Sequence, residues 1–221
     1  MKLIIIDSGL GGKDFMKKFR KRYVNTNLQC EFLKPFENMI NTYSIHYIRE
    51  NIINLLHTFN NKYVYSIIIA CNSISSCIID ILFLNNFIIN RIKIYEPIIP
   101  ICLYIHQKNI FKNILILSTP LTEKIGWHHR FLNRSNIIIK YVSFPLLAKE
   151  LEEGTSYSKS LNILRQQKEF ISDCDCVVLG CSHYNAIKDE ILSLLKIKYN
   201  FKGVILDSNI IQLDFFINSN M

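Results

Sequence analysis

Short apolar runs recur along the chain, and each ends abruptly in a cluster of small polar residues. Each run is rich in β-branched or aliphatic residues and has the length of a strand that is buried on both faces of a parallel sheet. The five runs are Lys2–Ile6, Tyr65–Ala70, Ile114–Leu117, Cys176–Gly180 and Gly203–Leu206. We therefore predict parallel strands whose carboxyl ends carry polar side chains.

Amphipathic segments of helical length lie between these runs. In residues 45–56 apolar side chains recur every three or four positions, which places them on one stripe of a helix. Residues 160–170 and 186–195 show the same spacing. Strands that alternate with helices predict an α/β fold with parallel sheets, in which ligands bind beyond the carboxyl ends of the strands.

The two halves of the chain resemble each other weakly. Cys71 follows one predicted strand and Cys181 follows another, about half the chain length further on. Each cysteine comes after a small residue and is followed by two polar residues. This similarity predicts two similar parallel-sheet α/β lobes, each with a cysteine at the end of a strand, and an active site in the cleft between them.

The predicted boundary between the lobes falls at a proline. We expect residues 1–96 to form the first lobe, joined by a returning segment at 207–221, and residues 97–206 to form the second. Pro97 marks the crossover, because a proline discourages a helical conformation of the residue before it.

Composition excludes several classes of protein. The 221 residues are 49% hydrophobic and 20% charged, which is typical of a globular chain and not of a disordered or fibrous one. The chain has no apolar stretch long enough for a membrane span, and its first apolar run ends at Asp7, too early for a secretory signal. We therefore predict a cytoplasmic protein.

The net charge of +8 invites a nucleic-acid partner, but the basic residues are mostly scattered lysines. Their one cluster, in residues 13–22, has the spacing of a solvated helix face. We expect a small-molecule substrate and no nucleic-acid or membrane partner, and the sequence permits a homodimer.

Seven cysteines in a cytoplasmic chain predict reduced thiols and no disulfide framework. Cys174, Cys176, Cys181 and His183 are close enough in sequence to suggest a metal site. The first pair, however, lacks the two-residue spacing that zinc clusters favour, so we expect no metal.

Cys71 and Cys181 suggest a different chemistry. Two thiols that face each other across a cleft can remove a proton from one face of a carbon and deliver one to the other face. The sequence shows no lysine motif for pyridoxal phosphate and no glycine-rich dinucleotide loop, so we expect this chemistry to proceed without a cofactor.

Four segments, in this order along the chain, are similar to the signature segments of the glutamate racemases, in the aspartate/glutamate racemase superfamily. They are Asp7–Gly12, Ala70–Ser73, Leu151–Gly154 and Leu179–Tyr184. The resemblance covers nearly the whole chain. It implies a two-lobed α/β fold and a cofactor-independent interconversion of L- and D-glutamate, which supplies D-glutamate for peptidoglycan in the cell wall.

The resemblance also implies roles for individual residues. Cys71 and Cys181 match the two catalytic cysteines, which must be thiolates to act as bases. Asp7 and His183 match the groups that assist each thiol, and Glu152 matches a carboxylate near the second. Positions that match substrate contacts are Asp7, Ser8, Phe36, Glu37, Asn72, Ser73, Ser182 and His183.

One segment departs from the family pattern and leaves alternatives open. Pro35-Phe36-Glu37 stands where the family has Pro-Tyr-Gly, so Glu37 brings a negative charge near the expected site of a dicarboxylate. If the loop keeps its shape, we expect Glu37 to point away from the cleft. The alternatives are an aspartate or broader-specificity amino-acid racemase, and a binding protein that kept the fold and lost turnover.

Overall fold

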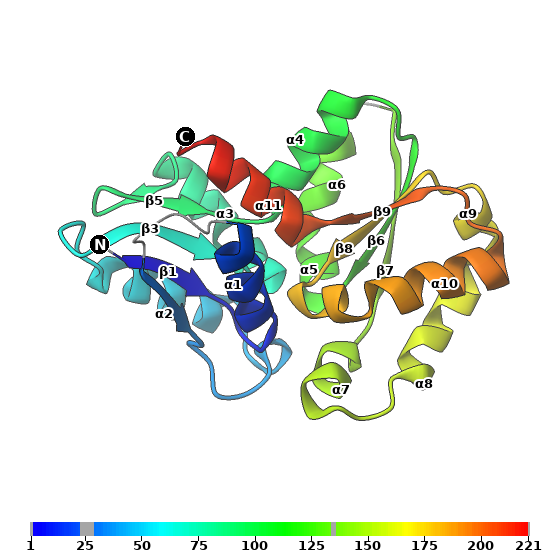
Figure 1. Ribbon diagram of the computed structural model, residues 1–221, viewed down its shortest axis with the longest axis horizontal. Helices are drawn as coiled ribbons and strands as arrows, with labels where there is room; N and C mark the ends of the chain where they lie inside the picture. Colours follow the sequence, from blue (N-terminus) through cyan, green and yellow to red (C-terminus); the bar gives the residue numbers. More distant parts are fainter. Residues whose placement is uncertain (1, 23–28, 134–135, 221) are drawn as a thin grey trace.

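The computed structural model describes residues 2–22, 29–133 and 136–220, which form two lobes side by side (Figure 1). The first lobe is built on a five-stranded sheet in the order β2-β1-β3-β5-β4, with only β4 antiparallel to its neighbour. Its strands are β1 (Lys2–Ile6), β2 (Gln29–Leu33), β3 (Val64–Ile69), β4 (Ile88–Ile89) and β5 (Ile92–Tyr95).

The second lobe is built on a four-stranded, fully parallel sheet in the order β7-β6-β8-β9. Its strands are β6 (Asn113–Ser118), β7 (Ile138–Ser143), β8 (Cys176–Gly180) and β9 (Val204–Asp207). All five strands expected from the apolar runs are present, and the α/β class with two parallel-sheet lobes is confirmed. The runs did not reveal β2, β5 and β7, whose apolar residues are interrupted by polar ones, or β4, which has only two residues.

Helices cover both sheets. Those of the first lobe are α1 (Gly11–Arg22), α2 (Ile45–Thr58) and α3 (Asn72–Leu84). A short 3₁₀ helix, η1 (Ile40–Thr42), lies just before α2. Those of the second are α4 (Ile98–Lys108), α5 (Pro120–Ile125), α6 (Trp127–Leu132), α7 (Leu147–Glu153), α8 (Ser158–Leu161), η3 (Asn162–Gln167), α9 (Lys168–Ser172), η4 (Ser182–Ile187) and α10 (Lys188–Tyr199). No helix among the described residues is long and apolar enough to cross a membrane.

Two of the three helices predicted from apolar spacing are confirmed, and one is wrong in detail. The helix predicted at 45–56 is α2, which buries Ile48, Ile52 and Leu56 and begins where the Ser44 hydroxyl accepts from the Tyr47 N–H. The helix predicted at 186–195 is α10. Residues 160–170 instead form three short pieces, α8, η3 and α9, in which 3₁₀ turns interrupt the α-helical spacing.

Successive residues of each central strand belong to different cores. In β1, Leu3 and Ile5 pack against α1, whereas Ile4 and Ile6 pack against α2 and α3. This alternation follows from the two-residue period of a strand, and it explains why both faces of the run are apolar. In β6, Leu115 and Leu117 likewise belong to a different cluster from Ile114 and Ile116.

The last helix returns to the first lobe. α11 (Ser208–Asn218) follows β9 of the second sheet, yet Leu213 and Phe216 join the core cluster of β1 and α1. The Phe216 ring meets Tyr95 of β5 edge-on at 4.9 Å between centroids. Gln212 donates to the Ile69 carbonyl at the end of β3. The chain therefore crosses between the lobes twice, once before α4 and once at α11.

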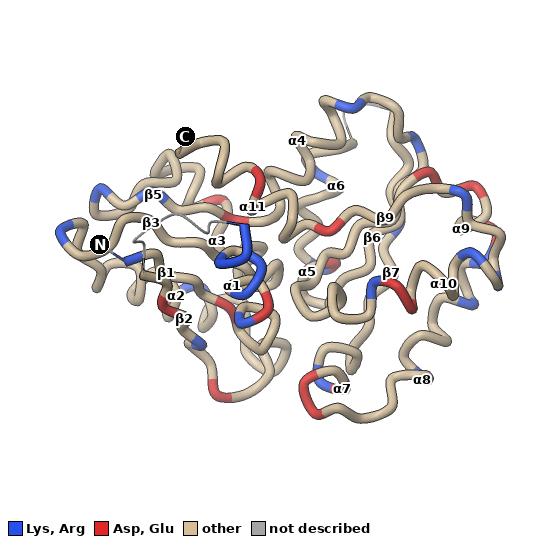
Figure 2. Tube along the Cα trace, viewed as in Figure 1, with Lys and Arg blue, Asp and Glu red and all other residues tan. Residues whose placement is uncertain are grey.

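The basic cluster of the sequence lies on α1 (Figure 2). Phe15 and Phe19 are buried on one face of this helix, and most of its basic side chains are exposed on the other, as predicted. Lys18 pairs with Asp14 and with Asp207, and Arg22 pairs with Asp214. These ion pairs place carboxylates next to two of the positive charges of α1.

His128, in α6 of the second lobe, is a buried histidine. Its side chain is 1% exposed, and neither ring nitrogen has a hydrogen-bond partner among the described residues. The ring meets Tyr141 edge-on at 6.1 Å. Burial lowers the pKa of His128 to about 4, so the folded protein holds it neutral.

His128 should therefore make the fold acid-sensitive. Its folded pKa lies below its unfolded value, so its contribution to stability is present above about pH 6.5 and is lost as the pH falls toward 4. Between pH 7 and pH 5 the wild type should lose about 2 kcal/mol more unfolding free energy than His128→Leu. Urea unfolding of both proteins at the two pH values measures this, and identical losses would contradict it.

Candidate active site

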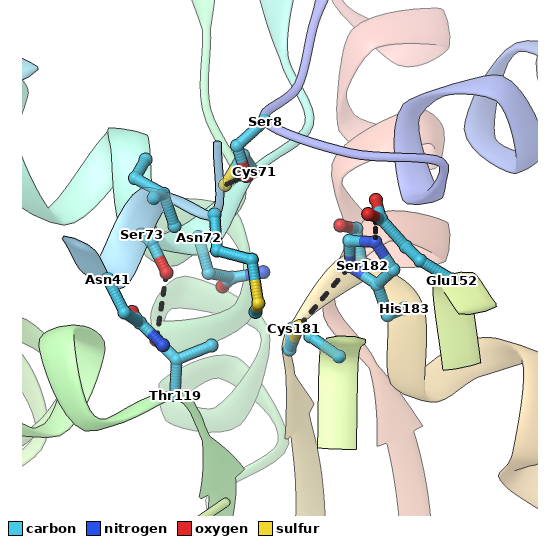
Figure 3. Close-up of a pocket in the computed structure, with 13 residues that line it drawn as sticks. Ser8, Asn41, Cys71, Asn72, Ser73, Thr119, Glu152, Cys181, Ser182 and His183 are labelled. Atoms are coloured by element: carbon cyan, nitrogen blue, oxygen red, sulfur yellow. Dashed lines mark hydrogen bonds and ion pairs between the residues drawn. The ribbon is translucent and has the colours of Figure 1, made fainter. Parts of the chain in front are cut away.

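A small cavity lies between the two lobes, where the carboxyl ends of β1, β3, β6 and β8 meet (Figure 3). Its volume is about 30 Å³, which is room for one or two water molecules. The polar clusters that follow the predicted strands supply most of its walls. A ligand larger than this would need more space than the cavity offers in this structure.

Cys71 reaches the cavity from the first lobe. It stands between the end of β3 and the first turn of α3, and its Sγ lies 3.2 Å from the Ser8 Oγ. Burial raises the pKa of the Cys71 thiol above its ordinary value, and the nearby Asp7 carboxylate raises it further. The thiol is therefore the resting form of Cys71 in the closed cavity.

Cys181 reaches the same cavity from the second lobe. It follows β8 directly, and its Sγ lies 3.8 Å from the Nδ1 of His183, two residues further on in η4. The extended backbone at Cys181 followed by the 3₁₀ turn brings these two side chains together. The structure thus places both cysteines singled out in the sequence on the wall of one cavity.

His183 and Glu152 form an ion pair beside Cys181. The His183 Nε2 lies 2.9 Å from the Glu152 Oε1. Burial by itself lowers the pKa of His183, but its contacts with Cys181 and Glu152 outweigh burial and raise that pKa to about 10. The hydrogen bond from His183 lowers the pKa of Glu152 to about 2. At neutral pH the imidazole is therefore positively charged.

Glu152 also joins the two lobes. Its Oε1 accepts from the backbone N–H of Leu10, in the turn that follows β1, at 2.7 Å. The approach is close: a Cβ on Gly9 would lie 1.9 Å from this oxygen, so the Glu152 carboxylate would have to move. A Cβ on Gly11 would lie 2.2 Å from the Ser182 Oγ. The glycines of this turn thus allow the lobes to meet at the site.

Asp7 lies behind the cavity wall and does not line it. The residue is completely buried, and its Oδ1 accepts from the Gly9 N–H at 2.9 Å. Its Oδ2 has no hydrogen-bond partner among the described residues. Burial raises the pKa of Asp7, and the positive His183 offsets part of this rise. Asp7 therefore holds a proton at a higher pH than an exposed aspartate does.

The other predicted contact residues fall into two groups. Ser8, Asn72, Ser73 and Ser182 line the cavity. Phe36 and Glu37 do not: Phe36 is buried against Tyr43, with ring centroids 5.3 Å apart, and Glu37 is exposed. The side-chain packing of Phe36 in the first core keeps this segment out of the cavity.

Several lining residues were missed in the sequence. Met39, Ile40 and Asn41, from the segment after Glu37, line the cavity in place of Phe36 and Glu37. Nothing in their pattern distinguishes them from an ordinary loop. Thr119 also lines the cavity, and here a signal existed, because it belongs to the polar cluster that follows the predicted strand Ile114–Leu117.

The cysteine-rich segment before the cavity shows no metal site. The Cys174 thiol donates to the carbonyl oxygen of Cys176 at 2.9 Å. Within residues 2–22, 29–133 and 136–220, no group of three or more His, Cys, Asp or Glu side chains is arranged to hold a metal ion.

The fold is that of the amino-acid racemases, among which both glutamate and aspartate racemases occur. Glutamate racemase from Francisella tularensis, solved with D-glutamate, superposes with a TM-score of 0.79 at 20% identity, covering 99% of this chain and 80% of that one. Aspartate racemase from Picrophilus torridus superposes with a TM-score of 0.63 at 17% identity, covering 98% and 92%.

In sequence, the chain is similar to glutamate racemases. Glutamate racemase from Aquifex pyrophilus is 28% identical over 200 residues, 88% of this chain and 76% of the relative. Its solved structure superposes with a TM-score of 0.76, covering all of this chain and 84% of that one. No protein-family model matches the chain. By these comparisons the chain is a homologue of the glutamate racemases, isomerases that act on amino acids.

The ion pair with Glu152 should control the charge of His183. In Glu152→Gln the pKa of His183 should fall from about 10 by at least about one unit, because the opposite charge that favours the imidazolium is gone. A pH titration of the His183 ring signals by NMR measures the shift. Glu153→Gln is the matched control, since Glu153 is the next residue and is exposed. An unchanged His183 pKa in Glu152→Gln would contradict this account.

Proposed function

We propose that the chain racemises glutamate without a cofactor, using Cys71 and Cys181 as two bases on opposite sides of the substrate. The observation that carries the proposal is the pair of buried thiols, one from each lobe, on the wall of a single cavity. A single base would return the proton to the face from which it came. Two bases on opposite faces invert the carbon.

In the proposed reaction one thiolate removes the proton from the α-carbon and becomes a thiol. The electron pair left by the broken C–H bond spreads into the substrate carboxylate. The thiol on the opposite face then gives its proton to the α-carbon and becomes a thiolate. The product is the mirror image of the substrate, and no other reactant is consumed. Polar donors around the carboxylate stabilise the charge that develops there.

The two thiols have different neighbours. The charged His183, with Nδ1 3.8 Å from the Cys181 sulfur, can exchange a proton with Cys181 during turnover. Cys71 rests as a thiol, and the Ser8 hydroxyl that contacts its sulfur can stabilise the thiolate during turnover. Asp7, with its raised pKa, is the group on the Cys71 side that can exchange a proton.

The proposal extends to the protein's organisation and its place in the cell. We assign residues 1–96 with 207–221 to one domain and residues 97–206 to the other, supported by the packing of α11 on the first sheet. Separation of these domains would open the cavity. The D-glutamate formed would supply peptidoglycan synthesis in the cytoplasm, and the sequence permits a homodimer.

Replacing either thiol by a hydroxyl should abolish most of the turnover. In Cys71→Ser and in Cys181→Ser, racemisation of L-glutamate should fall about 10²- to 10⁴-fold, because an alcohol is a far weaker acid than a thiol. The loss of optical activity of L-glutamate measures the rate, and L-aspartate is assayed in parallel.

Cys30→Ser is the matched control, because Cys30 lies on the edge strand β2 and does not line the cavity. It should retain the wild-type rate. Near wild-type racemisation by either cavity variant would rule out the two-base mechanism. A wild-type protein that racemises aspartate and not glutamate would overturn the substrate assignment.

A further inference from the structure

The cavity has a second polar side, away from His183 and Glu152. Figure 3 shows Asn41, Ser73 and Thr119 gathered there, with the thiols of Cys71 and Cys181 between the two sides. Ser73 comes from the first turn of α3, Thr119 precedes α5, and Asn41 lies in η1. None of the described residues that line the cavity is a lysine or an arginine.

The hydroxyl groups on this side already bind one another. The Ser73 Oγ lies 2.8 Å from the Thr119 Oγ1 and 3.3 Å from the Thr122 Oγ1, and the two threonine oxygens lie 3.1 Å apart. Each hydroxyl has one hydrogen to donate, so a closed ring of three uses all three hydrogens. A ligand on this side must either break the ring or find a donor elsewhere.

Asn41 provides that donor. Its Oδ1 is shielded from solvent and has no hydrogen-bond partner among the described residues. The amide also carries two N–H donors, and a ligand that accepts from them adds hydrogen bonds without breaking the hydroxyl ring. The neighbouring Asn72 uses one of its two N–H donors on the Ser208 hydroxyl, at 3.3 Å, and its Oδ1 likewise has no partner among the described residues.

Electrostatics favour a negatively charged ligand group here. α3 begins at Asn72, and the free backbone N–H groups of a helix's first turn attract anions. The one charged donor near the cavity, His183, lies on the other side and is paired with Glu152. A substrate carboxylate beside Ser73 would therefore depend on neutral donors.

We propose that Asn41 is a specificity-determining residue, whose amide N–H donates to a substrate carboxylate on the Ser73–Thr119 side of the cavity. This assignment rests on the proposed amino-acid racemase function and deepens it. It gives the segment after Pro35-Phe36-Glu37 a direct contact with the substrate, although Phe36 and Glu37 lie outside the cavity.

The test replaces the amide by a carboxylate of the same size. In Asn41→Asp, D-glutamate should bind about ten- to a hundredfold more weakly, because two like charges then meet in a closed site. Asn41→Ala, which only removes the donor, should weaken binding about three- to tenfold. Calorimetry measures both affinities without turnover. Racemisation kinetics should show the same increase in KM with little change in kcat.

Asn38→Asp is the matched control, since Asn38 lies in the same segment and is exposed outside the cavity. It should bind D-glutamate like the wild type. Equal or tighter binding by Asn41→Asp would overturn the proposal and would indicate that the amide faces the substrate ammonium or does not touch the substrate. If Asn41→Asp does not fold, unchanged affinity of Asn41→Ala overturns it.

The same measurements separate this proposal from the proposed function. A wild type that binds D-glutamate in an Asn41-dependent way and does not racemise it would refute the reaction and keep the contact. A wild type that racemises glutamate with affinities independent of Asn41 would refute the contact and keep the reaction. A wild type that binds neither glutamate nor aspartate would overturn both.

Discussion

Hydrogen bonds to the Glu152 carboxylate connect the two lobes at the site. Its Oε1 binds the Leu10 N–H of the first lobe and the His183 ring of the second. Because the same oxygen makes both contacts, closure of the cleft and the charge of His183 are coupled. The positive imidazole lies beside Cys181. A Cβ on Gly11 would lie 2.9 Å from the backbone carbonyl carbon of Ser182, so this glycine allows the close approach of the lobes.

The cavity divides into a charged side and a neutral side. His183 and Glu152 form the first, and hydroxyl and amide groups form the second, with the two thiols between them (Figure 3). The cavity has a volume of about 30 Å³, and burial beside it raises the pKa of Cys71.

The two crossings between the lobes are firmly packed. At the first, the buried Glu96 carboxylate accepts from the Ser75 hydroxyl and from two backbone N–H groups of α4. At the second, Asn209 and Gln212 of α11 donate to the Ala70 and Ile69 carbonyls at the end of β3, one and two residues before Cys71. The thiol of the first lobe is thus positioned partly by the last helix of the chain.

The sequence by itself determined the α/β class, the central strands, helices α1, α2 and α10, and the polar clusters at the strand ends, because buried parallel strands and amphipathic helices have strong local patterns. Resemblance to a family pointed to Cys71, Cys181, Ser8 and His183, and the structure brings all four to one cavity. Only the tertiary structure decided that Phe36 packs into the core, that Asp7 lies behind the wall, and that Asn41 and Thr119 line the cavity. These placements arise from contacts between segments far apart in the chain, and no local pattern encodes which side chain such contacts leave facing a cavity.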